Sequence, residues 1–279
     1  QGRADSGVKE PSKAADPIVF HADVRRMLLN AKAISEASRC FAMYVAKELD
    51  TNKYSDDDAA KKAANDRVAL LTPVAKAFLT DRGLEASIDA QQCFGGHGYI
   101  REWGMEQIVR DTRIAQIYEG TNGIQALDLL GRKVLQTKGA LLRDFTKIIY
   151  DFTQEQANNA ELQALISELA SLNKEWGQLT NRIGERAREN ADEVGAAAVD
   201  YLYFAGYVTL GYLWARMAVV AQQKLAHGSS EVEFYKAKIK VADFYFERML
   251  PRTQGHAEAM VNPSKTMTSL AAEHFSFDY

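Results

Sequence analysis

This 279-residue sequence has few cysteines and histidines, and its positive and negative charges nearly balance. The only cysteines, Cys40 and Cys93, lie far apart and form no CxxC pair, which excludes a disulfide framework and favours a reducing, cytoplasmic compartment. The five histidines are scattered, so we expect no metal site. The 34 basic and 37 acidic residues give a net charge of −3, which is atypical of a nucleic-acid-binding protein.

Signals for β-strands are nearly absent as well. The chain has only five prolines and no pair of alternating apolar runs joined by Asn-Gly or Asp-Gly. Apolar residues instead recur at spacings of three and four, which is the period of a helix with one buried face. The sequence therefore predicts an all-α protein. The main helices are expected over residues 24–49, 58–93, 105–115, 122–135, 141–157, 162–188, 201–226 and 231–250.

No segment is both long enough and free enough of charged residues to be expected to span a membrane. The most apolar run, from Tyr201 to Val220, contains Arg216. A spanning helix needs about 20 apolar residues, and a charge within it is costly. We therefore expect this run to be a helix buried on most sides inside a bundle.

The chain is expected to fall into three parts. Residues 1–17 are polar, with glycines, prolines and charges, and predict a loop or a disordered segment. Residues 18–138 predict a helical bundle that is incomplete at its start. After Lys138-Gly139 the pattern changes to long helices, so residues 139–279 predict a second helical bundle.

Common catalytic motifs are also missing. The sequence has no GxGxxG after a strand, no GxxxxGK[ST], no HExxH and no GxSxG. Its most irregular stretch is Gln91–Gln125, where glycines, aromatic residues and charges gather between helices. Within it, Glu119 follows an apolar segment and precedes a flexible turn, so its carboxylate is a candidate site residue. Taken alone, it is more typical of a solvated acid just before a helix N-terminus than of a catalytic group.

Two motifs in this stretch, FGGHGYIRE and RDTRIAQIYEGTNGIQ, carry a family resemblance. They resemble the C-terminal helical domain of the acyl-CoA dehydrogenases, which are FAD-dependent flavoproteins. The second bundle, with DFYFERMLPRT, is similar to an extra C-terminal domain of larger bacterial members such as the 3-methylmercaptopropionyl-CoA dehydrogenases. The resemblance covers nearly the whole chain and implies two successive helical bundles.

The resemblance also implies roles for single residues. Glu119 corresponds to the catalytic base of the family, which removes the proton α to the thioester carbonyl. Its neighbours Tyr118 and Gly120 would contact the acyl-CoA substrate. The residues implied to contact FAD are Gln92, Gly95, Gly96, Thr121 and Asn122. Two of these features have a plain structural alternative, because Gly-Gly commonly ends a helix and Thr or Asn commonly caps one.

The implied reaction gives a trans-2-enoyl-CoA, with the β-hydride passing to flavin N5. In the family, electrons then leave through an electron-transferring flavoprotein, in a step of fatty acid β-oxidation. Because the Gly95-Gly96 loop resembles one that contacts the FAD of a neighbouring subunit, a homodimer or homotetramer is implied.

The resemblance further implies that helical and β-rich domains precede this region in intact family members. We therefore expect the chain by itself to have no dehydrogenase activity and to bind FAD weakly or not at all. Two other functions remain open from the residues: a non-catalytic helical module for oligomerisation or interaction, and an acyl-CoA oxidase that uses oxygen.

Overall fold

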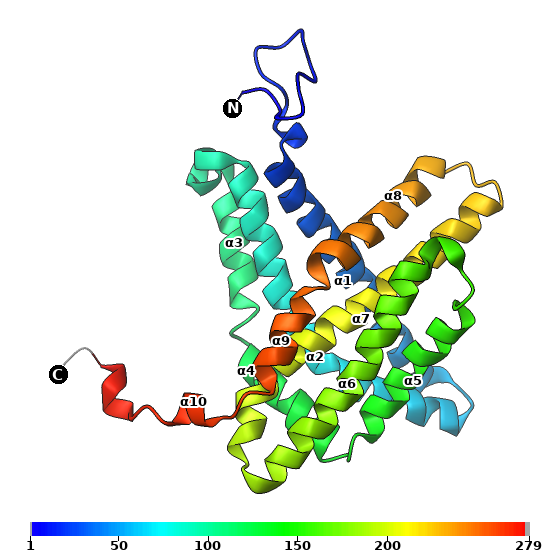
Figure 1. The fold of residues 1–279 in the computed structure, drawn as a ribbon, viewed down its shortest axis with the longest axis vertical. Coiled ribbons are helices and arrows are strands. Elements are labelled where there is room, and N and C mark those ends of the chain that lie inside the picture. The colour runs from blue at the N-terminus through cyan, green and yellow to red at the C-terminus, as the bar shows by residue number, and fades with distance from the viewer. Residues whose placement is uncertain (1, 277–279) are drawn as a thin grey trace.

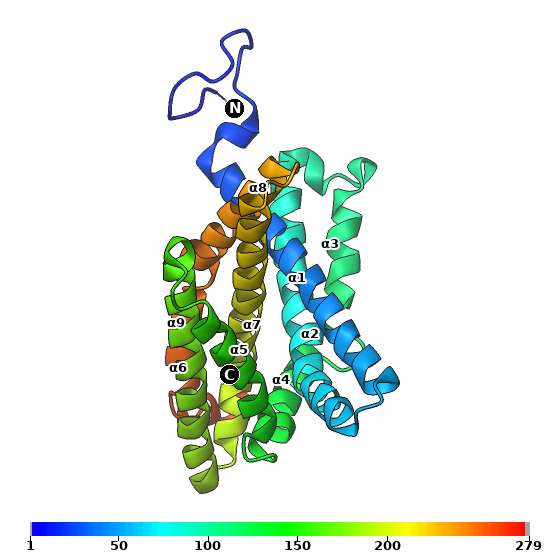
Figure 2. The same cartoon turned by 90° about the vertical axis from the view of Figure 1, so that its right-hand side faces the viewer.

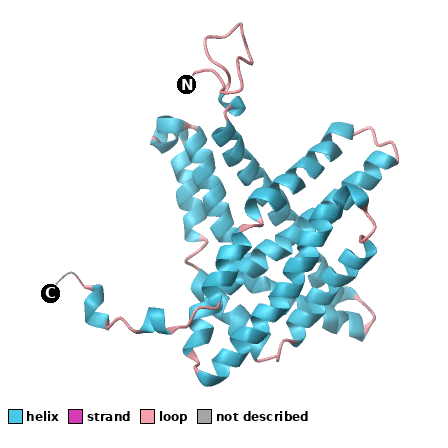
Figure 3. Ribbon diagram, in the orientation of Figure 1, coloured by secondary structure: helices cyan, strands magenta, loops and turns pink. Residues whose placement is uncertain are grey.

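The computed structural model describes residues 2–276, and in that range it contains helices and no strands (Figure 3). This confirms the all-α prediction. The α-helices are α1 (Ala22–Tyr54), α2 (Asp58–Cys93), α3 (Met105–Ile114), α4 (Asn122–Leu127), α5 (Ala140–Glu155), α6 (Gln163–Glu189), α7 (Asp192–Ala226), α8 (Val232–Phe244), α9 (Arg252–Met260) and α10 (Lys265–Thr268).

The first two helices form a long hairpin, with α3 packed against α2 (Figure 2). The carboxylate of Asp57 caps α2 by accepting a hydrogen bond from the Ala59 N–H at 2.9 Å. Apolar side chains at helical spacing, including Ile34 and Phe41 of α1, are buried along the contact. Pro73 lies inside α2, and the helix continues through it to Cys93.

Helix α7 runs through the middle of the molecule, where it contacts α1, α2, α4, α6, α8 and α9 (Figures 1 and 2). By length and composition it could cross a membrane, but 83% of its most apolar window is buried inside the molecule. The apolar run around Tyr201 is thus a central core helix. The core is one continuous cluster that includes residues of both predicted bundles, such as Phe78 and Trp214. The boundary at residues 138 and 139 stays a prediction.

Two helices depart from the expected pattern. The helix predicted over 231–250 is α-helical only to Phe244 and continues as the π-helical segment Tyr245–Met249. A second π-helical segment, Asp128–Leu135, follows α4 directly. Pro251 lies just after the π-helical segment Tyr245–Met249 and is also the N-cap residue of α9. Helix α9 was not predicted from the sequence. Proline suits such a position because the first turn needs no N–H donor.

The segment before α1 is a loop folded around one buried carboxylate. Asp16 accepts hydrogen bonds from the backbone N–H groups of Ala4 at 2.9 Å, Lys9 at 2.9 Å and Glu10 at 2.7 Å. These bonds, that of Ala4 above all, lower the pKa of Asp16 to about 2 against the opposing effect of desolvation. The guanidinium of Arg3, 3.4 Å away, acts in the same direction.

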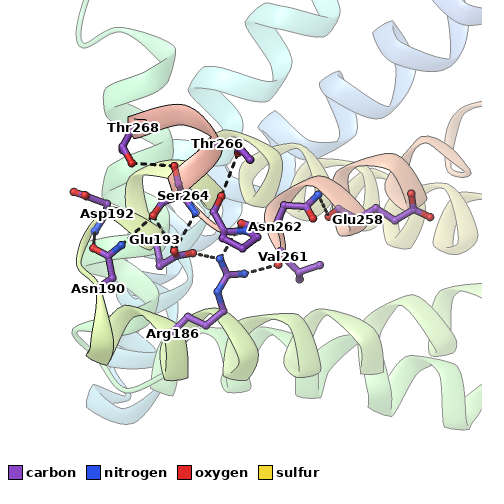
Figure 4. A network of polar contacts seen from close by, with 11 residues as sticks. Arg186, Asn190, Asp192, Glu193, Glu258, Val261, Asn262, Ser264, Thr266 and Thr268 are labelled. Atoms are coloured by element: carbon purple, nitrogen blue, oxygen red, sulfur yellow. Dashed lines mark hydrogen bonds and ion pairs between the residues drawn. The ribbon is translucent and has the colours of Figure 1, made fainter. Parts of the chain in front are cut away.

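A second buried carboxylate ties the end of the chain to the body (Figure 4). Glu193, at the start of α7, pairs with Arg186 of α6 and accepts hydrogen bonds from the Ser264 N–H at 3.0 Å and hydroxyl at 2.8 Å. Arg186 also donates to the carbonyl oxygens of Val261 and Asn262, just after α9. Beyond this anchor the chain leaves the body as an extended tail (Figure 1).

Candidate active site

The turn between α3 and α4 carries Glu119 in an unusual backbone conformation. Its φ of 54° lies in the left-handed region, and Gly120 follows with a φ of 84°. A left-handed conformation is uncommon for a non-glycine residue and costs about 1 kcal/mol, so the surrounding structure must hold it. Tyr118, Glu119, Gly120 and Thr121 are all exposed, which places the Glu119 carboxylate at the surface.

Helix α2 holds this turn in place. The ammonium of Lys76 donates to the Gly120 carbonyl oxygen at 2.7 Å and to Asn122 Oδ1 at 2.8 Å. Five residues further along, Asp81 Oδ1 accepts from Gln116 Nε2 at 2.6 Å and from Asn122 Nδ2 at 2.7 Å. Desolvation by partial burial lowers the pKa of Lys76 from its usual value.

The side chains of Thr121 and Asn122 therefore differ in what they face. Thr121 is the N-cap of α4, with its hydroxyl 3.5 Å from the Ile124 N–H, and remains exposed. Asn122 points inward, where its amide also donates to the Ala77 carbonyl at 3.2 Å. The cap and anchor roles are thus observed for these residues, while their contact with a cofactor stays a prediction.

The second predicted group lies at the end of α2. Gly95 has a φ of 59° and Gly96 is open, with nothing within 4 Å of the place where a Cβ would stand on either residue. Gln92 and Gly95 line a groove of about 680 Å³ with Ile18 and His21. In the described part of the chain, the buried Nε2 of His21 has no hydrogen-bond partner. The groove therefore offers an unsatisfied polar atom beside an accessible glycine backbone.

The two groups of predicted residues do not meet within one chain. Gln92, Gly95 and Gly96 precede α3, whereas residues 118–122 follow it (Figure 1). At 1.5 Å per residue, the ten residues of α3 separate them by about 15 Å. Among the described residues, two separate grooves lie at these regions: Gln92 and Gly95 line one, and Thr121 and Asn122 line the other.

A smaller cavity of about 370 Å³ lies behind the Glu119 turn, between α4 and α7. Its lining includes Asp81, Asn122 and Tyr203. The Tyr203 hydroxyl donates to Asp81 Oδ2 at 2.6 Å. Burial raises the pKa of Tyr203 well above its usual range, and the hydrogen bond to Asp81 adds to the shift. Neither Asp81 nor Tyr203 was identified from the sequence, because no local motif marks either residue.

A large share of the surface near both groups is apolar. The exposed apolar side chains around α3 and α4 are 42% to 84% exposed, and they are Phe94, Tyr99, Ile100, Trp103, Ile108, Ile114, Ile117, Tyr118, Ile124 and Leu127. Many exposed apolar side chains in one region of the sequence favour an interface with another domain or subunit.

Both halves of the chain match models of known protein families. Residues 7–135 match the family model "Acyl-CoA dehydrogenase, C-terminal domain", and residues 145–271 match "Acetyl-CoA dehydrogenase C-terminal like". The 3-methylmercaptopropionyl-CoA dehydrogenase of Ruegeria pomeroyi is 35% identical over 85% of this chain and 40% of the relative. A butyryl-CoA dehydrogenase of Syntrophomonas wolfei is 31% identical over 95% of this chain and 44% of the relative.

The fold has solved counterparts as well. The crystal structure of an acyl-CoA dehydrogenase from Bacillus anthracis, complexed with FAD, superposes with a TM-score of 0.69 at 16% identity. That likeness covers 94% of this chain and 46% of the Bacillus chain. The present chain thus spans less than half the length of these relatives.

Proposed function

Because the chain belongs to the acyl-CoA dehydrogenase family, we propose that it serves as the C-terminal helical part of an FAD-dependent enzyme. This enzyme would oxidise an acyl-CoA thioester to a trans-2-enoyl-CoA, as a step of fatty acid β-oxidation. The observation that carries the proposal is the Glu119 turn, in which an exposed carboxylate stands in a left-handed backbone conformation on an anchored loop.

Glu119 is proposed as the base that removes the α proton. The α proton of a thioester is a far weaker acid than a carboxylic acid, so the charge that develops on the carbonyl oxygen needs hydrogen-bond donors. Across the described residues, no acceptor is paired with the backbone N–H of Glu119. That N–H is therefore available to the thioester oxygen. Tyr118 and Gly120 flank the carboxylate and would contact the acyl chain or the thioester.

The residues around the end of α2 fit a bound FAD. Gly95 and Gly96 allow a close approach to the backbone, Gln92 supplies an amide, and the unpaired His21 Nε2 lies in the same groove. Thr121 leaves its hydroxyl exposed near the base, while the amide of Asn122 is already engaged. When bound, FAD would supply the hydride acceptor, N5, for the β carbon. The chain's own residues would hold the cofactor and take the proton.

The separation of the two groups supports an oligomer. Since the residues before α3 and those after it lie about 15 Å apart, we propose that they serve two different flavins, as in a homodimer or homotetramer. The exposed apolar side chains around α3 provide an interface for such an assembly. Both cysteines are free thiols, which fits the proposed cytoplasmic location. The proposed electron acceptor is an electron-transferring flavoprotein.

The base is tested by changing Glu119→Gln in the complete polypeptide that contains this chain. We expect formation of enoyl-CoA to fall by about 10²- to 10⁴-fold, the usual contribution of a general base, with FAD still bound. Glu102→Gln is the matched control, because Glu102 is also exposed and precedes α3. Full activity of the Glu119→Gln enzyme would show that the base is another residue.

The chain by itself provides a second test. Because the proposed flavin contacts lie in open grooves of the isolated chain, we expect the purified 279-residue polypeptide to bind FAD weakly or not at all and to lack dehydrogenase activity. Flavin absorbance after gel filtration measures this directly. A yellow protein with one FAD per chain would contradict the expectation.

A further inference from the structure

Asp81 stands at the junction of three elements. From the loop before Glu119, Gln116 Nε2 donates to its Oδ1 at 2.6 Å. From the first residue of α4, Asn122 Nδ2 donates to the same oxygen at 2.7 Å. From α7, the Tyr203 hydroxyl donates to Oδ2 at 2.6 Å. Hydrogen bonds to a carboxylate are short and about twice as strong as neutral ones, so this junction is a rigid one.

The junction fixes both ends of the turn that carries Glu119. Gln116 and Asn122 bracket residues 117–121, and the Asn122 N–H also donates to the Gln116 carbonyl oxygen at 3.2 Å. Lys76 adds a bond to the Gly120 carbonyl at 2.7 Å. Apart from that backbone bond, these anchors end on α2, at Lys76 and Asp81. The left-handed conformation of Glu119 is held by these bonds.

Tyr203 is itself held firmly from two sides. The imidazole of His256, on α9, stacks on its ring at 5.0 Å between centroids, and the Arg82 guanidinium lies 5.2 Å from the ring centre. His256 Nδ1 is in turn 2.8 Å from Asp200 Oδ1. The ring of Phe78 meets Tyr203 edge-on at 6.2 Å. Tyr203 on α7 and His256 on α9 belong to the second predicted bundle, so that bundle fixes the place of the Tyr203 hydroxyl together with Phe78 and Arg82 of α2.

We propose that Tyr203 and Asp81 are positioning residues for Glu119. Through them the second helical bundle sets the turn that presents the base. The inference rests on the proposed role of Glu119, and it gives the second bundle a function in the reaction. Loss of the Tyr203 hydroxyl leaves Asp81 with one unpaired oxygen, so its hold on Gln116 and Asn122 changes. A misplacement of about 1 Å in a catalytic group can cost about 10²-fold in rate.

The test is Tyr203→Phe in the complete polypeptide, with Tyr201→Phe as the matched control. Tyr201 is also on α7, and its hydroxyl lies 2.8 Å from Thr180 Oγ1, away from the turn. We expect Tyr203→Phe to lower kcat by about 10- to 100-fold, with KM and FAD content close to wild type. Hydrogen exchange in the peptide that spans residues 115–123 should accelerate. We expect Tyr201→Phe to lower thermal stability while leaving kcat and the exchange of this peptide unchanged.

A second variant keeps the inference testable if Tyr203→Phe folds poorly. Asp81→Asn keeps the size of the side chain but removes the charge, and we expect the same fall in kcat per bound FAD. Because the two residues act through one contact, the double variant should lose no more than the stronger single variant. Wild-type kcat in either single variant, or losses that multiply in the double variant, would overturn the inference.

The result that would contradict the proposed function differs from the result that would contradict the positioning role. If Glu119→Gln retains activity, Glu119 is not the base. If Glu119→Gln is inactive while Tyr203→Phe turns over at the wild-type rate, the base stands and only the positioning role is lost.

Discussion

Helices α2 and α7 pack tightly where Gly206 meets the ring of Phe78. A Cβ placed on Gly206 would lie 2.2, 2.4 and 2.6 Å from three ring carbons, whereas ordinary contacts begin at 3.4 Å. The ring would have to move by about 1 Å. It is fully buried and confined by the rings of Tyr203 and Tyr207, at 6.2 and 4.9 Å between centroids. Gly206→Ala should therefore destabilise the chain.

The size of this effect follows from two opposing terms. Alanine is favoured over glycine in a helix interior by about 1 kcal/mol. Overpacking of a tight core costs about 1–3 kcal/mol and occasionally more. With a confined ring the clash should be at the upper end, so we expect a net loss of about 2 kcal/mol, or a fall in Tm of about 4–8 °C.

Urea unfolding of the purified chain, followed by circular dichroism, measures this loss. The matched control is Gly177→Ala in α6, where a Cβ would meet nothing within 4 Å. The control should gain about 0.5–1 kcal/mol from helix propensity. If Gly206→Ala is as stable as the wild type, or if both variants lose equally, α2 and α7 do not pack as the structure shows.

Two further predictions concern the buried carboxylates. Because the folded pKa of Asp16 is lowered to about 2 from its usual value of 3.8, its contribution to stability is present above pH 3.8 and is lost as pH falls toward 2. Hydrogen exchange of residues 2–17 should therefore accelerate over that window, and Asp16→Asn should abolish the pH dependence; protection that does not change with pH would contradict this. Glu193→Ala leaves Arg186 without its carboxylate, so we expect a loss of about 3 kcal/mol in urea unfolding and faster proteolysis of the 262–276 tail. Glu258→Ala, at an exposed side chain of α9, is the control, and equal effects of the two variants would rule out the anchor.

Much of the fold could be predicted from the sequence, because helical periodicity is a local signal. The spacing of apolar residues gave α3 and α6 to within a residue or two of their observed ends. The π-helical segments were missed because an i→i+5 pattern has no distinct apolar spacing. Helix α9 was missed because the last expected helix ended at residue 250, just before Pro251, although proline also suits the start of a helix.

In the candidate site, too, only the features that depend on adjacent residues could be predicted from the sequence. Glu119 was recognised because it lies within a motif of adjacent residues. Its anchors were not, because Asp81 and Tyr203 are 122 residues apart and meet only through the packing of α2 against α7. The role of Asn122 also depends on a residue that is distant in the sequence. Its neighbours in the sequence suggested a cap or a cofactor contact, while its amide in fact serves the junction at Asp81.

The measurement that tests the central claim most directly is exchange of the substrate's α proton with solvent deuterium. A thioester that cannot lose its β-hydride isolates proton removal from the redox step. We expect the complete wild-type polypeptide to catalyse this exchange, and the Glu119→Gln variant, with FAD bound, to be slower by about 10²-fold or more. Exchange at the wild-type rate by the Glu119→Gln variant would contradict the assignment of Glu119 as the base.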